Sequence, residues 1–140
     1  MIHLALESAE PGDVLVVNGQ SSLAHGLFGD LMARRAIAAG VVGLVVDGAV
    51  RDRMALIELG FPTYALGVCA AGPAKEGAGE VGSPIACGRV AVHSGDVVVG
   101  DGDGVVVVPQ SDLAVVTRNV ASILDWELAQ RDASELNRGG

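Results

Sequence analysis

Two valine-rich runs with a helical pattern between them constrain the fold more than any other feature of this chain. Residues 14–17 and 41–46 are almost wholly apolar, as buried strands are, and residues 31–39 between them have a helix-forming pattern that Gly40 ends. A strand, a helix and a strand in this order predict parallel strands joined by a helical crossover. The pattern then repeats as a short helix and an extended segment, at residues 53–59 and 61–66.

Turn-forming residues mark the expected ends of these strands. Asn18-Gly-Gln-Ser-Ser22 is rich in turn-forming residues and predicts the end of the first strand, and Asp47-Gly48 predicts a turn after the second. Residues 3–9, ahead of the turn Pro11-Gly-Asp13, are expected to be the end of a helix.

The second half of the chain has a different character. Glycine, alanine and proline dominate residues 67–88, which predicts a long loop with short strands. Valine runs then predict strands joined by turns, and Asp101-Gly-Asp-Gly104 has the composition of a type I′ hairpin turn. Residues 111–136 predict an amphipathic helix with Ser111 as its N-cap. The strands are expected at residues 90–92, 97–99 and 105–108.

Length and composition complete the fold prediction. A chain of 140 residues is expected to form one domain, and 50% hydrophobic residues with only 3% aromatics predict a core built mainly from valine, alanine, leucine and isoleucine. The expected fold class is α/β, as a single domain over residues 1–140 with mixed parallel and antiparallel sheets.

Charge excludes one large class of function. The formal net charge is −8 and the nearest approach to a basic cluster is Arg34-Arg35, so direct binding of nucleic acid is not expected. The apolar run at residues 41–46 is too short to cross a bilayer, and the first residues lack the pattern of a signal peptide, so we expect a soluble cytoplasmic protein. Cys69 and Cys87 lack the spacing of a metal site and are expected to be reduced thiols.

Two apparent motifs in the second half are better explained by loop chemistry. Gly77-Ala-Gly-Glu-Val-Gly82 matches G-x-G-x-x-G, but no strand pattern precedes it and Ser83-Pro84 follows it, so a glycine-rich loop is expected rather than a nucleotide site. Asp101-Gly-Asp-Gly104 resembles part of a calcium loop without the remaining ligands, which again favours a turn.

Asp30 and the pair Arg51-Asp52 are the candidate functional residues. Twenty residues separate Asp30 from Arg51, enough for one helix and one strand that returns the chain to the same end. Ligands of α/β sheets bind beyond the carboxyl ends of strands, where Arg51-Asp52 is expected, and a helix start at Gly29-Asp-Leu31 offers amides to an anion. Two carboxylates and a guanidinium at one rim suit a divalent cation with an anionic substrate. Taken alone, Asp30 and Asp52 could equally be helix caps.

These residues resemble a known family. Gly29-Asp-Leu31, the following gap and Val50-Arg-Asp52 are similar to the Asp-x20-Arg-Asp signature of the RraA-like/4-hydroxy-4-methyl-2-oxoglutarate aldolase family. The resemblance extends through residues 11–17, 43–48 and 101–109 and covers nearly all of the chain. It implies a swivelling β/β/α-type fold with mixed sheets, assembled as homotrimers or as hexamers made of trimers.

The resemblance also implies a function. The aldolases of this family are class II enzymes that use Mg²⁺ or Mn²⁺ to cleave 4-hydroxy-2-oxo-dicarboxylates to pyruvate and a second oxo acid, and they often decarboxylate oxaloacetate. Both reactions leave an enolate of pyruvate, which a Lewis-acidic cation and a fixed positive charge would stabilise. A carboxylate that orients water could accept the proton of the 4-hydroxyl.

Residue by residue, the resemblance implies specific roles. Asp52 would bind the metal, Arg51 would bind the 2-oxo acid and stabilise the enolate, and Asp30 would hold water bound to the metal. Glu127 is the candidate for an acidic residue that a neighbouring subunit supplies. The implied substrate-binding positions are Gly29, Asp30, Leu31, Met32 and Arg51.

Two features depart from the family pattern. Members usually carry a further segment before the block with which this chain begins, so a domain lacking that segment is expected. Asn18-Gly19-Gln20 stands where members often carry Asp-Gly-Gly, which leaves the identity of the substrate open. The rival function is a non-catalytic RraA-type regulator that inhibits ribonuclease E by protein contact, which an acidic surface would suit. A third alternative is an inactive fragment.

Overall fold

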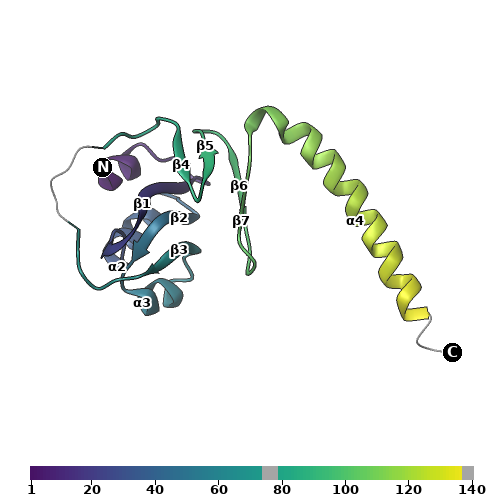
Figure 1. Ribbon diagram of the computed structural model, residues 1–140, viewed down its shortest axis with the longest axis horizontal. Helices are drawn as coiled ribbons and strands as arrows, with labels where there is room; N and C mark the ends of the chain where they lie inside the picture. The colour runs from purple at the N-terminus through teal and green to yellow at the C-terminus, as the bar shows by residue number, and fades with distance from the viewer. Residues whose placement is uncertain (74–78, 137–140) are drawn as a thin grey trace.

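The computed structural model describes residues 1–73 and 79–136, and Figure 1 shows them as a body of helices and strands from which one long helix departs. The described residues form an α/β fold with one parallel and two antiparallel sheets, so the predicted fold class is confirmed. In chain order the elements are α1 (Ile2–Glu7), β1 (Val14–Gly26), α2 (Asp30–Ala38), β2 (Gly43–Val50), α3 (Arg53–Glu58), β3 (Thr63–Val68), β4 (Ile85–Cys87), β5 (Val90–Val92), β6 (Val97–Gly100), β7 (Val105–Val108), the 3₁₀ turn η1 (Gln110–Asp112) and α4 (Leu113–Leu136).

The first half of the chain builds the parallel sheet. β2 lies at its centre, with β1 on one side and β3 on the other, and both pairings are parallel. α2 and α3 are the crossovers between successive strands, as the alternating pattern predicts. Residues 14–17 pair with residues 43–46 in unbroken register, which places the carboxyl ends of the strands at one edge.

Both valine-rich strands run further than their turn-forming residues predict. The expected end at residues 18–22 and the expected turn at Asp47-Gly48 are wrong, because β1 continues to Gly26 and β2 to Val50. β1 shifts its register twice on the way, and such bulges bend a strand while keeping it on the sheet. The extension brings Gly26 opposite Ala49, at the edge where the candidate residues lie.

The first bulge contains two residues in a left-handed conformation. Gln20 and Ser21 have φ angles of 56° and 55°, which residues other than glycine rarely adopt. The amide of Gln20 donates to the side-chain oxygen of Asn18 at 2.7 Å, and the Ser21 hydroxyl donates to the Asp47 carboxylate at 2.9 Å. Asp47 therefore anchors the bulge of the neighbouring strand instead of forming a turn.

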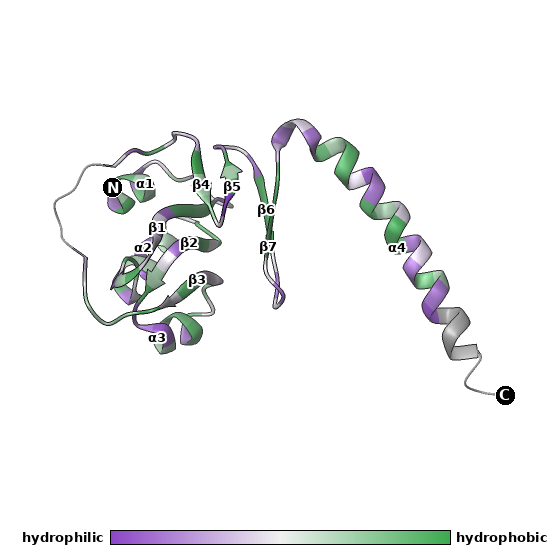
Figure 2. Cartoon of the chain, in the orientation of Figure 1, coloured by the Kyte–Doolittle hydropathy of each residue, from purple (hydrophilic) through white to green (hydrophobic). Residues whose placement is uncertain are grey.

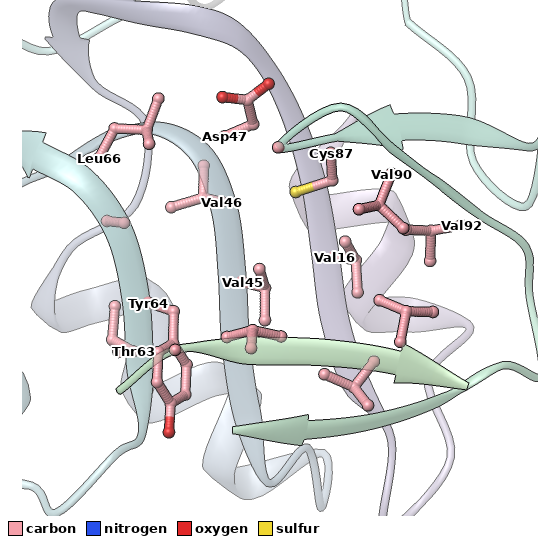
Figure 3. Close-up of a pocket in the computed structure, with 16 residues that line it drawn as sticks. Val16, Val45, Val46, Asp47, Thr63, Tyr64, Leu66, Cys87, Val90 and Val92 are labelled. Atoms are coloured by element: carbon pink, nitrogen blue, oxygen red, sulfur yellow. The ribbon is translucent and has the colours of Figure 1, made fainter. Parts of the chain in front are cut away.

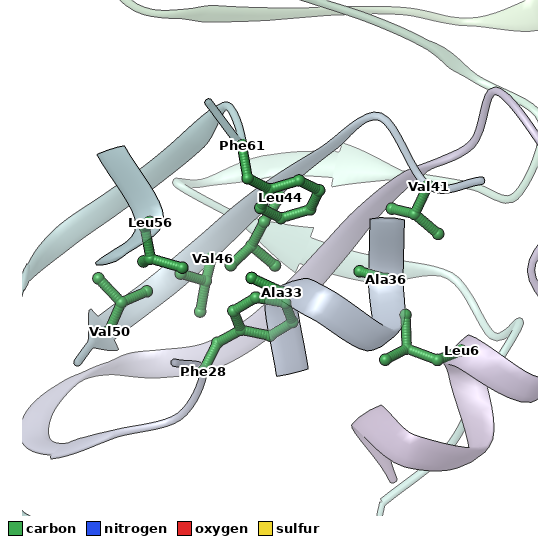
Figure 4. Packing of buried hydrophobic residues seen from close by; sticks show 10 residues of the cluster. All are labelled: Leu6, Phe28, Ala33, Ala36, Val41, Leu44, Val46, Val50, Leu56 and Phe61. Atoms are coloured by element: carbon green, nitrogen blue, oxygen red, sulfur yellow. The ribbon is translucent and has the colours of Figure 1, made fainter. Parts of the chain in front are cut away.

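The hydrophobic core lies between the parallel sheet and the helices that cover it (Figure 4). Phe28 and Leu44 are its largest fully buried side chains, and Phe28 stacks on Phe61 with ring centroids 6.0 Å apart. Ala33 and Ala36 are completely buried, so the small side chains of α2 allow it to lie close to the sheet. The core cluster comprises Leu6, Phe28, Ala33, Ala36, Val41, Leu44, Val46, Val50, Leu56 and Phe61.

The second half of the chain forms two antiparallel pairs. β4 pairs with β5 and β6 with β7, so the strands predicted at residues 90–92 and 105–108 are confirmed, and the one predicted at 97–99 extends to Gly100. β4 is a short strand within the predicted loop region. Residues 74–78, with the start of the glycine-rich motif at 77–82, lie outside the described residues.

The turn between β6 and β7 is a hairpin turn, but the predicted type I′ is wrong. Neither Gly102 nor Asp103 has the positive φ that this type requires at both central positions. Instead, the Asp101 carboxylate accepts hydrogen bonds from the amides of Asp103 and Gly104, at 2.8 and 3.2 Å. An aspartate side chain that bonds the backbone two residues ahead stabilises the turn, and within residues 101–104 the positive φ is at Gly104, 153°.

An apolar cavity of about 400 Å³ lies between the parallel sheet and the antiparallel pairs (Figure 3). Val45 of β2 lines it, while the next residue along the strand, Val46, belongs to the core cluster and also reaches the cavity edge. Tyr64 lines it from β3, and Cys87 and Val92 line it from the β4–β5 pair.

α4 runs outward from the body, and its described side chains are mostly exposed (Figures 1 and 2). Its apolar residues are spread around the helix and form no single apolar face, so the predicted amphipathic pattern is wrong. The rest of the described chain leaves α4 in solvent. Ser111 lies inside η1 and donates to Asp112 at 3.0 Å, so the predicted N-cap is also wrong. No helix within residues 1–73 and 79–136 combines the length and apolarity needed to cross a membrane.

Candidate functional site

The candidate residues meet at the carboxyl edge of the parallel sheet. Arg51-Asp52 directly follows β2, and Asp30 is the first residue of α2. Two backbone hydrogen bonds hold the loop before α2 against the end of β2, from the Leu27 amide to the Ala49 carbonyl and from the Arg51 amide to the Phe28 carbonyl, both at 2.8 Å. The helix and strand between the two sequence segments therefore bring them side by side.

Asp52 connects the two segments. Its Oδ2 accepts a hydrogen bond from the backbone amide of Asp30 at 3.1 Å, so its carboxylate lies at the amino end of α2. Asp52 adopts φ 53° and ψ 38°, a left-handed conformation that costs an L-residue about 1 kcal/mol. It occupies the N-cap position of α3 without a side-chain hydrogen bond to that helix, and Gly29, not Asp30, is the N-cap residue of α2. Neither carboxylate therefore caps the helix next to it in sequence, and that of Asp52 instead binds the first amide of α2.

Gly29 allows this close approach. A Cβ atom at Gly29 would lie 2.5 Å from Oδ2 of Asp52 and 2.7 Å from Cγ of Arg51, well inside van der Waals contact. Its φ of −156° is ordinary extended backbone, so space and not conformation excludes a side chain. Gly26 plays the same part on the other side, where a Cβ would lie 2.8 Å from Cβ of Arg51.

Arg51 lies beside Asp52 with most of its donors available. The distance from its Nε to Oδ2 of Asp52 is 3.6 Å, an ion pair, and no hydrogen bond from its guanidinium to any described residue is formed. The loop after β3 passes over it, since the Cys69 amide donates to the Val50 carbonyl at 2.8 Å and a Cβ at Gly72 would lie 3.1 Å from Nη1 of Arg51. A guanidinium with free donors and 39% of its side chain exposed can receive an anion.

Asp30 is held from its other side by Arg34. Nε of Arg34 donates to Oδ1 of Asp30 at 2.9 Å, one helical turn further along α2. The contacts thus run from Arg34 to Asp30, to Asp52 and to Arg51, with two carboxylates between two guanidiniums. Arg34 is absent from the predicted site, although its i, i+4 spacing from Asp30 is a sequence signal that could have found it.

The amino end of α2 provides part of the predicted anion cradle. The Asp30 amide is engaged by Asp52, and the Met32 amide donates to the Gly29 carbonyl at 3.0 Å. The Leu31 amide has no acceptor among the residues that the structure describes. The Gly29 amide likewise has no acceptor in the described part of the chain, so the amides of Gly29 and Leu31 are open to a ligand.

Glu127 does not join this arrangement within one chain. It lies on α4, which runs away from the body, and it pairs with Arg131 at 3.9 Å (Figure 1). A role for Glu127 at the site therefore requires a second copy of the chain.

The donor set fits a hard divalent cation that keeps part of its water. Asp30 and Asp52 provide carboxylate oxygens, and Mg²⁺ in proteins is usually held by one or two carboxylates together with water and substrate. Within the described ranges, no group of three or more His, Cys, Asp or Glu side chains could hold a metal ion. A cation enclosed by side chains alone is therefore not supported, whereas one held by one or two carboxylates is.

The apolar cavity of Figure 3 is separate from this rim. Its lining contains none of Asp30, Arg51 and Asp52, and its carboxylate, Asp47, is bound by Ser21. Burial, and after it the charge of Asp47, raises the pKa of the Cys87 thiol in the same cavity. A buried thiol that stays protonated is a poor nucleophile. The chemistry-bearing groups are thus concentrated at the open edge of the sheet.

Comparisons with known proteins agree on the family. The family model described as RraA-like, Aldolase/RraA, matches residues 1–107. A protein of Halalkalibacterium halodurans named "Putative 4-hydroxy-4-methyl-2-oxoglutarate aldolase" is 41% identical over 106 residues, which are 76% of this chain and 50% of that protein. The chain therefore spans about half the length of this curated relative.

Solved structures of similar proteins have the same fold. One is RraAS2 of Streptomyces coelicolor, described as an unusual member of the RNase ES inhibitor RraA protein family. It has a TM-score of 0.85 at 36% identity, and the match covers 93% of this chain and 67% of the RraAS2 chain. The RNA-processing inhibitor RraA from Thermus thermophilis has a TM-score of 0.69 at 38% identity, and the match covers 78% of this chain and 68% of that protein's chain. The names of these relatives divide between an enzyme and an inhibitor.

Proposed function

The chain belongs to the RraA-like family, and from this premise we propose that it is a lyase that depends on a divalent metal, Mg²⁺ or Mn²⁺. Its proposed substrates are 4-hydroxy-2-oxo-dicarboxylates of the 4-hydroxy-4-methyl-2-oxoglutarate type, cleaved to pyruvate and a second oxo acid, and oxaloacetate, decarboxylated to pyruvate. The observation that carries the proposal is the cluster of Asp52, Arg51 and Asp30, joined by contacts of 3.1 and 3.6 Å.

Asp52 is the residue that would hold the cation directly, and Asp30 would hold water bound to it. When bound there, the cation would supply Lewis-acid stabilisation to the negative charge that develops on the 2-oxo group. Asp52 is the better direct ligand, because its carboxylate lies between the Asp30 amide and Arg51, at the centre of the cluster.

Arg51 binds the carboxylate of the 2-oxo acid and stabilises the enolate. Its guanidinium lies between Asp52, 3.6 Å from its Nε, and the loop at Gly72, beside the place where charge would develop. Fixed donors of this kind account for a large share of the rate enhancement in many enzymes. The open amide of Leu31 adds a neutral donor at the amino end of α2, where the helix favours negative charge.

Asp30 takes the proton. In cleavage, the 4-hydroxyl proton passes to Asp30, directly or through one water, as the C3–C4 bond breaks and its electrons enter the enolate. Arg34 occupies Oδ1 of Asp30, which leaves Oδ2 for this proton. Decarboxylation of oxaloacetate breaks the same bond and releases carbon dioxide, so it needs no proton acceptor, and a proton from water converts the enolate to pyruvate.

We also propose that the active form is a homotrimer or a hexamer, in which α4 of one copy brings Glu127 to the site of its neighbour. The exposed apolar side chains of α4 support this, because monomeric proteins rarely leave large apolar patches in water. Mixing inactive Asp52→Ala and Glu127→Gln chains should restore part of the activity if each site uses residues of two copies. Mixed oligomers without activity would contradict a shared site.

The deciding test of the enzyme is pyruvate release. The protein is incubated with Mg²⁺ and either oxaloacetate or 4-hydroxy-4-methyl-2-oxoglutarate, and pyruvate is followed by a coupled assay. We expect pyruvate that requires both the metal and Asp52, with Asp52→Asn inactive. Asp103→Asn is the matched control, because Asp103 lies in the exposed turn between β6 and β7 and should leave the rate unchanged. A rate of pyruvate release in Asp52→Asn equal to that of the wild type would contradict the proposal.

The second candidate function is a non-catalytic regulator that inhibits ribonuclease E by protein contact. It is favoured by the names of the Streptomyces coelicolor and Thermus thermophilis relatives and by the net charge of −8, which suits a basic partner. A folded protein that releases no pyruvate from either substrate but binds the ribonuclease in a salt-dependent manner would favour this function over the enzyme.

A further inference from the structure

Arg34 presents a fixed but only partly used guanidinium at the rim of the site. Its Nε donates to Oδ1 of Asp30 at 2.9 Å, and this is its one hydrogen bond among the residues that the structure describes. A guanidinium has five N–H donors, so the two terminal amino groups remain available. The side chain is 60% exposed, which leaves these groups accessible to a ligand.

The contact with Asp30 also fixes where those donors lie. Side chains on a helix lean toward its amino end, and residues four apart have Cβ atoms roughly 5–6 Å from each other. The side chain of Arg34 therefore folds back over the first turn of α2, toward the end at which Asp52 binds the Asp30 amide. Its guanidinium is held beside the reacting groups before any ligand arrives.

Each of the two carboxylates thus has a guanidinium of its own. Arg51 contacts the Asp52 carboxylate and Arg34 contacts the Asp30 carboxylate, while the backbone amide of Asp30 donates to Asp52. In the proposed function, Arg51 takes the carboxylate next to the 2-oxo group. A substrate with a second carboxylate at its far end needs a second cationic group. That group must be separated from Arg51 by about the length of a short carbon chain.

Arg34 is better placed for this task than the other arginines nearby. Arg35 points to α1, where its guanidinium lies 3.1 Å from the ring of His3 in a small cleft that Leu6 and Glu7 complete. Arg53 follows Asp52 directly but is exposed and forms no ion pair or hydrogen bond with a described residue. Arg34 is the one of these three that is tied to a residue of the site.

We propose that Arg34 binds the distal carboxylate of dicarboxylic 2-oxo acids and thereby selects them over monocarboxylic ones. This inference rests on the proposed function, because it assumes that the 2-oxo acid end is bound at Arg51. It assigns Arg34 a role in specificity that is distinct from chemistry at the 2-oxo group.

A matched pair of unreactive ligands tests this directly. 2-Oxoglutarate lacks the 4-hydroxyl needed for cleavage, and 2-oxopentanoate has the same five-carbon chain with a methyl group in place of the distal carboxylate. Binding of each is measured by isothermal titration calorimetry with Mg²⁺ at low ionic strength. The ratio of the two affinities reports the distal carboxylate alone, without any turnover.

We expect the wild type to prefer 2-oxoglutarate by about three- to tenfold, the range for a charge-assisted contact at an exposed position. Arg34→Gln should bring the ratio close to one and leave the affinity for 2-oxopentanoate unchanged, while Arg34→Lys should keep part of the preference. Arg53→Gln is the control for loss of positive charge near the site and should keep the ratio. Added salt should reduce the preference, because the contact is exposed.

The other outcomes overturn the inference in distinguishable ways. If Arg34→Gln weakens both ligands equally, Arg34 only positions Asp30. If Arg53→Gln removes the preference as strongly as Arg34→Gln, the preference comes from the general field and not from Arg34. An unchanged ratio in Arg34→Gln refutes the contact. Wild-type protein that binds neither ligand refutes the proposed function, and the inference with it.

Discussion

The carboxylate of Asp52 accepts the backbone amide of Asp30 at 3.1 Å, so the residue that follows one strand also occupies the amino end of the preceding helix. A negative group at this position is stabilised by the helix, typically by 0.3–1 kcal/mol. The contact joins the two parts of the signature by a hydrogen bond, and it makes the geometry of α2 and of the turn after β2 dependent on each other.

Substitutions of Asp52 should separate its backbone conformation from its carboxylate. Asp52→Gly and Asp52→Ala both lose the hydrogen bond to Asp30, but only glycine adopts φ 53° without strain. We therefore expect Asp52→Gly to be more stable than Asp52→Ala by about 1 kcal/mol in urea unfolding, with metal-dependent pyruvate release absent from both. Equal stability of the two variants would contradict a strained backbone at this residue.

Gly29→Ala should damage the site more than a glycine substitution elsewhere. The added Cβ would lie 2.5 Å from Oδ2 of Asp52 and 2.7 Å from Cγ of Arg51, so one or both must move. Overpacking of this kind typically costs about 1–3 kcal/mol, and we expect a large loss of pyruvate release. Gly102→Ala is the control, since a Cβ there meets nothing within 4 Å. If Gly29→Ala keeps both stability and activity, the close packing has no functional role.

Asp96 should make folding sensitive to acid. The backbone amide of His93, and that of Gln110 to a lesser extent, hold the pKa of Asp96 below its ordinary value of 3.8, against the opposing effect of burial. Because the pKa is lowered on folding, the stabilisation is fully present above pH 3.8 and is lost as pH falls through the lower value of the folded protein. Asp96→Asn lacks this charge, so its stability deficit relative to the wild type should be largest at neutral pH.

Urea unfolding of both proteins at neutral pH and at pH values below 3.8 checks this prediction. The two midpoints should converge on acidification as Asp96 becomes protonated. The turn that Asp96 closes, through hydrogen bonds of 2.9 Å from the His93 amide and 3.2 Å from the Gln110 amide, connects β5 to β6 and fixes the start of η1. A constant difference at all pH values would show that the charge of Asp96 contributes nothing.

The two cysteines should react at different rates. Cys87 is buried, and burial together with nearby Asp47 raises its thiol pKa, so little thiolate is present at neutral pH. Cys69 is only partly buried. A thiol-reactive chromophore should label one thiol rapidly in the native protein and the second only in urea, with Cys69→Ala removing the fast phase. Fast labelling that persists in Cys69→Ala would mean that Cys87 is accessible.

The parallel half of the fold could be predicted because buried strands and crossover helices have local signals. The valine-rich runs at residues 14–17 and 41–46 and the helix pattern at 31–39 all correspond to observed elements. The continuation of β1 to Gly26 could not be predicted in this way. It depends on a hydrogen bond between Ser21 and Asp47, 26 positions apart, which overrides the turn preference of the residues around it.

The meeting of Asp30 with Arg51-Asp52 could be predicted, but their contacts could not. The spacing of Asp30 and Arg51-Asp52 across one helix and one strand indicated that they would meet. The left-handed backbone of Asp52 and the contact from Arg34 arise only when the loop before α2 is packed against the end of β2. For α4, sequence pattern alone could not identify a buried face, because the described part of this chain offers α4 no surface to cover.

The outward course of α4 gives the molecule an unusual hydrodynamic shape. Its 24 residues span about 36 Å, comparable to the diameter of a small globular domain. A particle with such an arm experiences more friction than a sphere of equal mass, so it sediments slowly and elutes early from a sizing column. If neighbouring copies fold their arms against one another, the frictional ratio should fall toward that of a compact particle as concentration rises. Sedimentation velocity would therefore report the position of the arm without any label.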